Sequence, residues 1–154
     1  MEQGKLDQAA IHGERAFALN PNDPRIVAQK GELLAWNGKS EEGAEWIKKA
    51  ARLDHHAAHK RAHLLGRALY GSRHYGDAID AYKQISSPQY GHLAEWAASY
   101  AQMGRDVEAR EQATAVRQIN PDFSIESYLH KLPYKEPTDR NHLKEGLVKA
   151  GLPE

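Results

Sequence analysis

Four histidines crowd into one short stretch of this sequence, Leu53 to His63. His55, His56, His59 and His63 lie within nine residues of a chain that has nine histidines in all. Imidazole groups spaced three and four residues apart on a helix lie on one side of it and can hold a metal ion such as zinc. The stretch is therefore the first candidate for chemistry.

A metal site here would have to rely on imidazole alone. The chain has no cysteine, and Asp54 is the only carboxylate nearby in the sequence. His55 stands at a junction between helices, whereas His56, His59 and His63 share one helical stripe and are the candidate ligands if a metal binds. We expect no physiological metal and no other cofactor.

A second group of reactive side chains occupies the stretch YGSRHYGDA. Ser72, His74 and Asp77 are the residue types of a serine–histidine–aspartate hydrolase site. Such a site needs its nucleophile in a strained turn with a base beside it, whereas short polar residues are expected at this turn between two helices in any case. We therefore expect no catalytic residue here and predict that the chain is not an enzyme.

The elements that must carry these residues repeat along the chain. Pro21 and His55 stand 34 residues apart in the similar junctions ALNPNDP and RLDHHA, and a third such junction, QINPDFS, begins at Gln118. Gly4 and Gly38 are also separated by 34 residues. A period of 34 residues is that of a repeated helix–turn–helix unit.

The residue types at the expected helix crossings support this repeat. All six crossing positions are small, because a bulky side chain there would force the two helices apart; they are Gly31, Gly43, Gly66, Ala78, Ala97 and Ala109. On these positions, and on the segments YGDAIDAYKQI and AASYAQMGRDVEAREQA, the chain resembles the tetratricopeptide repeat (TPR) family. The resemblance implies an all-α fold, a right-handed superhelix of antiparallel helix pairs with a C-terminal helical cap.

Helix start and stop signals divide the chain into an array and a cap. The array is expected at 1–121, with an incomplete first unit at 1–21 and further units at about 24–55, 57–88 and 89–121; capping helices follow at 122–154. Helices are expected at about 6–19, 24–37, from Ser40 onward, and at about 57–71, 75–86, 89–103, 106–119, 124–131 and 137–150.

The resemblance also implies a concave groove lined by the first helix of each pair. Counting from the crossing positions gives the candidate peptide-binding residues Arg25, Glu32, Trp36, Lys60, His63, Arg67, Tyr70 and Gln102. Basic and aromatic side chains together suit an acidic or C-terminal peptide. Ala28 and Glu32 stand where the family's chaperone-tail binders begin their carboxylate clamp, which argues against that ligand. The alternative is that these are ordinary solvated groove residues.

Composition narrows the classes of partner. Lys plus Arg and Asp plus Glu are each 21, so the formal net charge is zero. This balance argues against nucleic acid and against an anionic membrane surface, both of which attract an excess of basic residues. No apolar run approaches the roughly 18 residues of a membrane-spanning helix. We expect a cytoplasmic protein.

The two ends of the sequence suggest its context. The first helix has no preceding partner, so a stripe with Leu6 and Phe17 is expected to be partly uncovered and the parent protein to continue upstream. The segment LPYKEPTDRNHLKEGLVKAGLPE resembles the tail of bacterial class III adenylate/guanylate cyclases that carry a TPR array. We predict a non-catalytic interaction module of a larger signalling protein, which binds a protein, a peptide or another domain of its own polypeptide. The alternative is a homodimer formed through the first helix.

Overall fold

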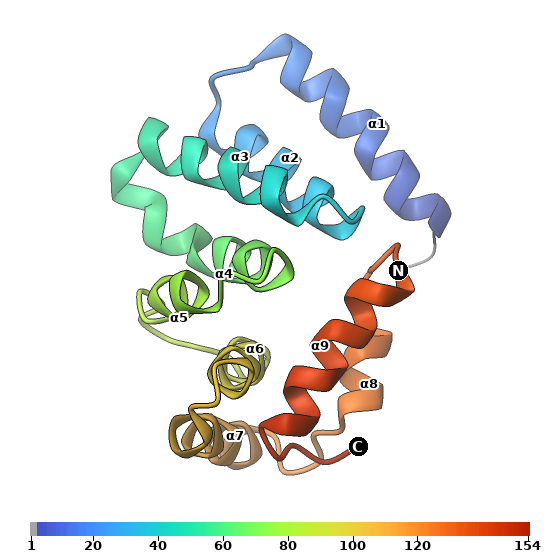
Figure 1. Ribbon diagram of the computed structural model, residues 1–154. Helices are drawn as coiled ribbons and strands as arrows, with labels where there is room; N and C mark the ends of the chain where they lie inside the picture. Colours follow the sequence, from blue (N-terminus) through green and yellow to red (C-terminus); the bar gives the residue numbers. More distant parts are fainter. Residues whose placement is uncertain (1–2) are drawn as a thin grey trace.

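The computed structural model describes residues 3–154, which form helices joined by short loops (Figure 1). In chain order these are α1 (Gln3–Leu19), α2 (Pro24–Trp36), α3 (Ser40–Leu53), the 3₁₀ helix η1 (His55–Arg61), α4 (Ala62–Gly71), α5 (Tyr75–Tyr82), α6 (Tyr90–Gln102), α7 (Asp106–Ile119), α8 (Ile125–His130) and α9 (Pro137–Lys149). No strand occurs within residues 3–154, and the prediction of an all-α fold is confirmed.

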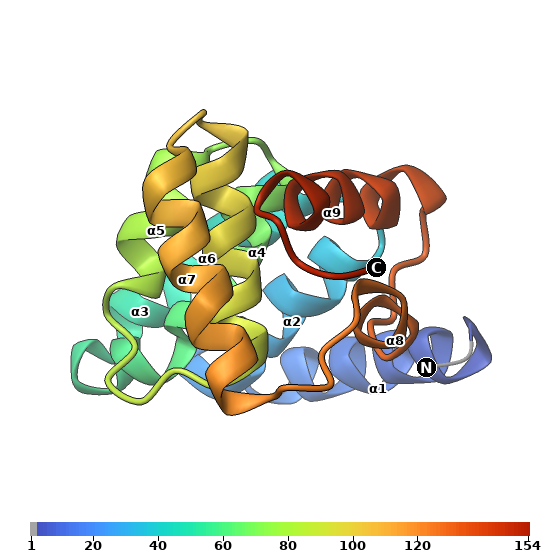
Figure 2. The ribbon, with the colours of Figure 1, turned by 90° about the horizontal axis from the view of Figure 1, so that it is seen from below.

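Successive helices pack in pairs, and the pairs stack on one another. α2 packs on α3, α4 on α5 and α6 on α7, while contacts of α3 with α4 and of α5 with α6 join the pairs. α1 packs on α2 at the start of the array. Figure 1 shows the pairs following an arc with α4 and α6 on its inner side, and Figure 2 shows α4 to α7 lying side by side.

The expected helix crossings are places of very close approach. A Cβ atom added to Gly31 would lie 2.6 Å from the carbonyl oxygen of Gly43, and one added to Gly43 would lie 2.5 Å from that of Gly31. A Cβ atom on Gly66 would lie 2.6 Å from the ring of Tyr82. Because backbone atoms cannot move aside without separating the helices, α2 and α3 can pack at this distance only through glycine.

Local signals set several helix ends where the sequence predicts them. The carboxylate of Asp23 caps α2 by accepting a hydrogen bond from the amide of Arg25 at 2.8 Å, and Pro24 begins the helix. Gly38 and Gly104 follow α2 and α6 with φ of 85° and 71°, the left-handed conformation that glycine adopts without strain. The bounds of α7 agree with the expected 106–119.

Two helices differ from the sequence prediction. The helix expected at 57–71 starts as the 3₁₀ helix η1 and becomes α-helical only at Ala62. The carboxylate of Asp54 accepts from the amide of Ala57 at 3.2 Å, so the chain turns tightly directly after α3. The helix expected at 75–86 ends at Tyr82, and the amide of Ile85 donates to the carbonyl of Tyr82 at 3.1 Å. Residue spacing does not reveal either change, because both kinds of helix place residues three apart on nearly the same side.

The C-terminal segment folds back into the concave side of the arc. α9 packs on α6 and α4, and α8 packs on α9 (Figures 1 and 2). Leu143 and Leu147 of α9 are almost completely buried and join the same core cluster as Tyr70 of α4. The amide of Ile125 donates to the carbonyl of Pro153 at 2.8 Å, which ties the start of α8 to the last residues. The segment expected as a cap therefore covers the inner side of the array.

α1 is more closely packed than its lone position suggests. Leu6 is buried, and the ring of Phe17 meets that of Trp46 on α3 edge-on, with 5.2 Å between ring centroids. On the other side of the helix Ile11 and Leu19 remain 55% and 88% exposed. Among the helices within residues 3–154, none combines the length and the apolar character needed to cross a membrane.

Candidate functional site

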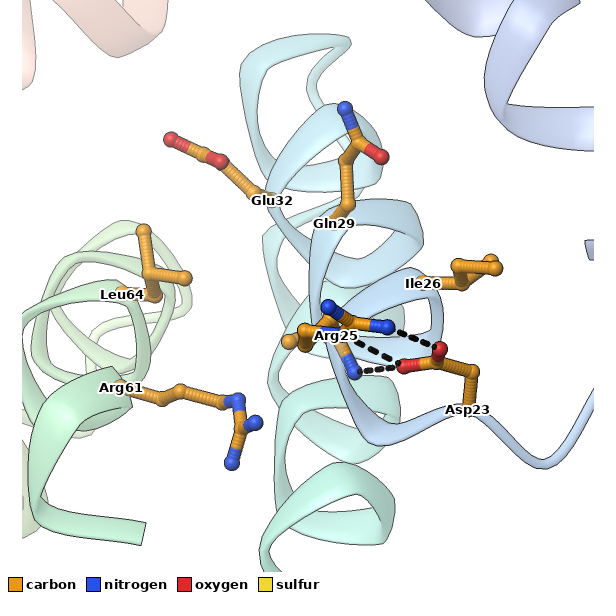
Figure 3. Close-up of a pocket in the computed structure, with 8 residues that line it drawn as sticks. Asp23, Arg25, Ile26, Gln29, Glu32, Arg61 and Leu64 are labelled. Atoms are coloured by element: carbon orange, nitrogen blue, oxygen red, sulfur yellow. Dashed lines mark hydrogen bonds and ion pairs between the residues drawn. The ribbon is translucent and has the colours of Figure 1, made fainter. Parts of the chain in front are cut away.

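An open cleft of about 500 Å³ lies where α2 faces η1 and the start of α4 (Figure 3). Its lining residues are Asp23, Arg25, Ile26, Ala28, Gln29, Glu32, Arg61 and Leu64. Two of the predicted groove residues, Arg25 and Glu32, are among them. Arg61 and Leu64 were not predicted, and the sequence placed Lys60 in the groove instead.

Arg25 is held at the mouth of the cleft by its neighbour Asp23. Its Nε and Nη2 groups donate to the two carboxylate oxygens at 3.2 and 2.8 Å. These side-chain bonds, with the backbone bond from the same residue, lower the pKa of Asp23 to about 2. The side chain of Arg25 is 83% exposed, so the N–H groups that do not face Asp23 are open to solvent and to a ligand.

Arg61 occupies the opposite wall of the cleft and is much less exposed. Only 12% of its side chain is accessible. Its Nη1 donates to the carbonyl of Ala57 at 3.4 Å, and its Nη2 lies 3.9 Å from the Oδ2 atom of Asp54. In Figure 3 the guanidinium reaches from the end of η1 into the space beside α2.

The charged side chains differ between the two ends of the cleft. Figure 3 shows Arg61 and the Arg25–Asp23 pair toward one end of the cleft and Glu32 toward the other. Within residues 3–154 the carboxylate of Glu32 takes part in no hydrogen bond or ion pair. Half-buried Ile26 and Leu64 provide apolar walls between the two ends. From one end to the other, the cleft therefore offers hydrogen-bond donors, apolar surface and a carboxylate that can accept hydrogen bonds.

Trp36 and Arg67 come together as the sequence predicts, but inside the protein. The guanidinium of Arg67 stacks over the ring of Trp36, 4.5 Å from its centroid. The ring of Tyr134, from the loop before α9, meets Trp36 edge-on with 4.9 Å between centroids. The amide of Lys135 donates to the carbonyl of Trp36 at 3.0 Å. The C-terminal segment thus covers these two side chains, and Trp36 is only 5% exposed.

Arg67 is neutralised by a buried carboxylate that the sequence did not single out. Its Nε and Nη2 groups donate to the Oε1 atom of Glu95 on α6 at 3.1 and 2.9 Å. The hydroxyls of Tyr128 and Tyr82 donate to the same carboxylate at 2.7 and 2.8 Å. Burial alone would raise the pKa of Glu95, but the guanidinium and these bonds hold it below its usual range. The negative charge is therefore kept inside the fold.

Tyr70 and Gln102 are also covered by α9. The hydroxyl of Tyr70 donates to the carbonyl of His142 at 2.8 Å, and its ring stacks on that of His142 at 4.6 Å. The amide nitrogen of Gln102 donates to the Tyr70 hydroxyl at 3.1 Å, while its oxygen accepts from Lys149 at 3.1 Å. Gly146 lets α9 approach this closely, since a Cβ atom there would meet the Tyr70 hydroxyl. The C-terminal half of the expected groove is filled by the chain itself.

The histidine stretch is divided by the change of helix type. His56 and His59 lie in η1 and are exposed, whereas His63 lies in α4, so the three do not share one α-helical face as expected. The ring of His63 instead packs against that of His92 on α6, with 5.0 Å between centroids. Within the part of the chain that the structure describes, no three His, Asp or Glu side chains converge as metal ligands.

Ser72 and His74 lie in contact with each other at the C-terminal end of α4, in an arrangement that differs from that of a hydrolase site. The Ser72 hydroxyl lies within donating distance of the carbonyls of Ala68 and Leu69, at 3.0 and 3.2 Å, at the C-terminal end of α4. The Nδ1 atom of His74 is 3.1 Å from the same hydroxyl oxygen. When the hydroxyl proton points to the backbone, His74 is the donor to Ser72, which is the reverse of what a general base requires.

Lys60 and Arg61 show why sequence counting missed part of the cleft. The prediction treated 57–71 as one α-helix, in which each residue advances by about 100°. A 3₁₀ helix advances by about 120° per residue, so positions before Ala62 are displaced around the axis. Lys60 is exposed outside the cleft, and Arg61 lines it. The signal that could have revealed this is Asp54, a cap at the start of η1.

Comparison with known proteins bears on the fold. No protein-family model matches the sequence. No curated protein matches it either. Similar solved structures include the crystal structure of MamA, with a TM-score of 0.67 and 22% sequence identity, covering 96% of this chain and 88% of that one. MamA has a TPR-like solenoid fold. The likeness shows that this chain has a TPR-like helical solenoid fold, and at this identity it shows the fold alone.

Proposed function

We propose that this chain is a non-catalytic protein-interaction module that binds an extended peptide segment of its partner in the cleft between α2 and α4. The observation that carries the proposal is the division of the concave side. Its C-terminal half is filled by the chain's own α9 and the loop that contains Tyr134, whereas the cleft of about 500 Å³ beside α2 stays open. Stacked helix pairs of a TPR-like solenoid form an extended concave surface that suits recognition of a partner.

The open cleft has the mixed character of a recognition site. Apolar surface comes from Ile26, Ala28 and Leu64, and polar groups of both signs come from Arg61 and Glu32. Its volume falls in the range of about 300–1,000 Å³ that is typical of ligand pockets. The walls are two helices whose backbone bonds are satisfied internally, so side chains, and not strand pairing, must make the contacts.

Selection of peptides followed by site mapping tests the proposal. A displayed library of random peptides is selected on the immobilised chain, and an enriched peptide is titrated into isotope-labelled protein. We expect the amide chemical shifts at 25–32 and 61–64 to move more than those of α7. Gln29→Trp, in the cleft, is expected to abolish binding, whereas Gln118→Trp, exposed on α7, leaves it unchanged. Failure to enrich any peptide, or shifts confined to other helices, refutes the proposal.

Self-association is a second candidate because of two exposed side chains on α1. Ile11 and Leu19 are 55% and 88% exposed on the helix that begins the array, and a second copy could cover them. Sedimentation at increasing concentration tests this candidate, and a mass that stays that of one chain rejects it. The signalling or cyclase context stays a prediction, and sequence upstream of Met1 in the parent gene would test it.

A further inference from the structure

We propose that the cleft selects peptides that carry an acidic side chain, and that Arg61 binds its carboxylate. The inference rests on the proposed function and adds the chemistry of the partner, which the fold leaves open. It is carried by the contacts of Arg61, by their contrast with those of Arg67, and by the different polar groups at the two ends of the cleft.

Arg61 is a largely buried cation with unused hydrogen-bonding capacity. A guanidinium has five N–H donors. Within residues 3–154 Arg61 makes one hydrogen bond, a long one of 3.4 Å to the carbonyl of Ala57, and its contact with Asp54 is 3.9 Å. Asp54 is itself engaged, since its carboxylate caps η1. A guanidinium that is paired this loosely on the wall of a cleft has donors left for a closer anion.

Arg67 shows how this protein satisfies an arginine that has only a structural role. Its side chain is 16% exposed, close to the 12% of Arg61. It nevertheless makes two hydrogen bonds of 2.9 and 3.1 Å to Glu95 and stacks on Trp36. Two arginines of similar exposure thus differ in how many of their donors are used, and the one with spare donors lines the open cleft.

The remaining charges of the cleft indicate how a peptide would lie. Arg25 stands toward the same end as Arg61; its charge is balanced by Asp23, and its exposed N–H groups that do not face Asp23 add hydrogen-bond donors there. Glu32 stands toward the other end without an ion pair among the described residues. The complementary peptide has an acidic side chain at Arg61, an aliphatic side chain over Leu64 and a basic side chain near Glu32. A carboxylate fits best at Arg61 because its two oxygens match the guanidinium fork.

The test uses peptides enriched from the random library by the wild-type chain. We expect an aspartate or glutamate at one fixed position, and replacing it by asparagine or glutamine is expected to weaken binding about tenfold or more. Arg61→Gln should weaken binding of the acidic peptide by a similar factor and have little effect on the neutral one. Arg105→Gln is the matched control, because Arg105 is an exposed arginine on the other end of the array, paired with Glu108. Binding of the acidic peptide should also weaken as salt rises.

The outcomes separate this inference from the proposed function. If peptides map to the cleft but have no acidic position, or bind Arg61→Gln as well as wild type, peptide binding stands and the role of Arg61 is wrong. If no peptide maps to the cleft, both proposals fail. Should Arg61→Gln not fold, the acidic and neutral peptides on the wild-type chain decide the question. Equal affinities of the two peptides then overturn the inference.

Discussion

Replacing Glu95 by glutamine should destabilise this protein more than most single substitutions. Glu95 is 1% exposed, and its carboxylate accepts two hydrogen bonds from Arg67 and one each from Tyr82 and Tyr128. Glutamine keeps the shape of the side chain. It removes the negative charge that balances Arg67 and places an NH₂ group where one of the two oxygens accepts hydrogen bonds.

The expected magnitude follows from breaking a buried ion pair. Removing one partner leaves the other charge uncompensated and costs about 3–5 kcal/mol. At least one hydroxyl or guanidinium donor then faces the new NH₂ group, which adds a buried unsatisfied donor. Total stabilities of about 5–15 kcal/mol are usual, so Glu95→Gln removes a large share. For a chain of this size each kcal/mol lowers Tm by about 2–4 °C, which gives a fall of roughly 6–20 °C.

Urea unfolding of Glu95→Gln, followed by circular dichroism, measures the effect. Glu108→Gln is the matched control, since Glu108 pairs with Arg105 on the surface, and it should cost no more than about 1 kcal/mol. Arg67→Leu combined with Glu95→Gln should cost less than the sum of the single changes, because the uncompensated guanidinium is gone. If the free energy of unfolding of Glu95→Gln lies within about 1 kcal/mol of that of the wild type, the buried ion pair does not stabilise the fold in the way reasoned above.

Three further changes test other parts of the fold. Gly31→Ala should cost about 1–3 kcal/mol in urea unfolding, because the new Cβ atom meets the Gly43 carbonyl at 2.6 Å; an unchanged midpoint would contradict this close crossing. Ser124→Ala removes the side chain that caps α8 and should cost about 1 kcal/mol, with faster amide exchange confined to α8 and its contacts. Burial lowers the pKa of His63 and His92 below 6.5 in the folded chain. The unfolded chain therefore binds more protons than the folded chain just below pH 6.5. The contribution of these two histidines to the free energy of unfolding is thus fully present above that pH and is lost as the pH drops. Urea unfolding at about pH 7.5 and about pH 5.5 should show this fall, and replacing both histidines by glutamine should reduce it.

Much of the helical architecture could be predicted because its signals are local. Asp23 followed by Pro24 starts a helix wherever it stands, and Gly38 ends one by adopting a positive φ. Glycine at both positions 31 and 43 predicts a close crossing of two helices, because such a crossing leaves no room for a side chain on either helix. The 3₁₀ start of the segment after Asp54 escaped prediction, since its residue spacing also fits an α-helix.

The candidate site was harder to predict because burial depends on what covers a side chain. Periodicity placed Trp36, Arg67 and Tyr70 on the inner side of the array, and the structure does bring Trp36 and Arg67 together. The periodicity of the sequence did not indicate that Tyr134 would cover Trp36 or that His142 would cover Tyr70. Such contacts join residues about 70 to 100 positions apart, and no single-sequence pattern records which distant segments meet.

The sequence by itself determined the period, the glycine crossings and most helix ends, because these depend on neighbours within a few turns or on the absence of a side chain. Only the tertiary structure decided which part of the concave side is open. Leu143 and Leu147 bury their side chains by folding α9 back onto α6, and this burial removes Tyr70 from solvent while leaving Arg61 at an open cleft. The free energy of that burial depends on surfaces that meet only in the folded chain.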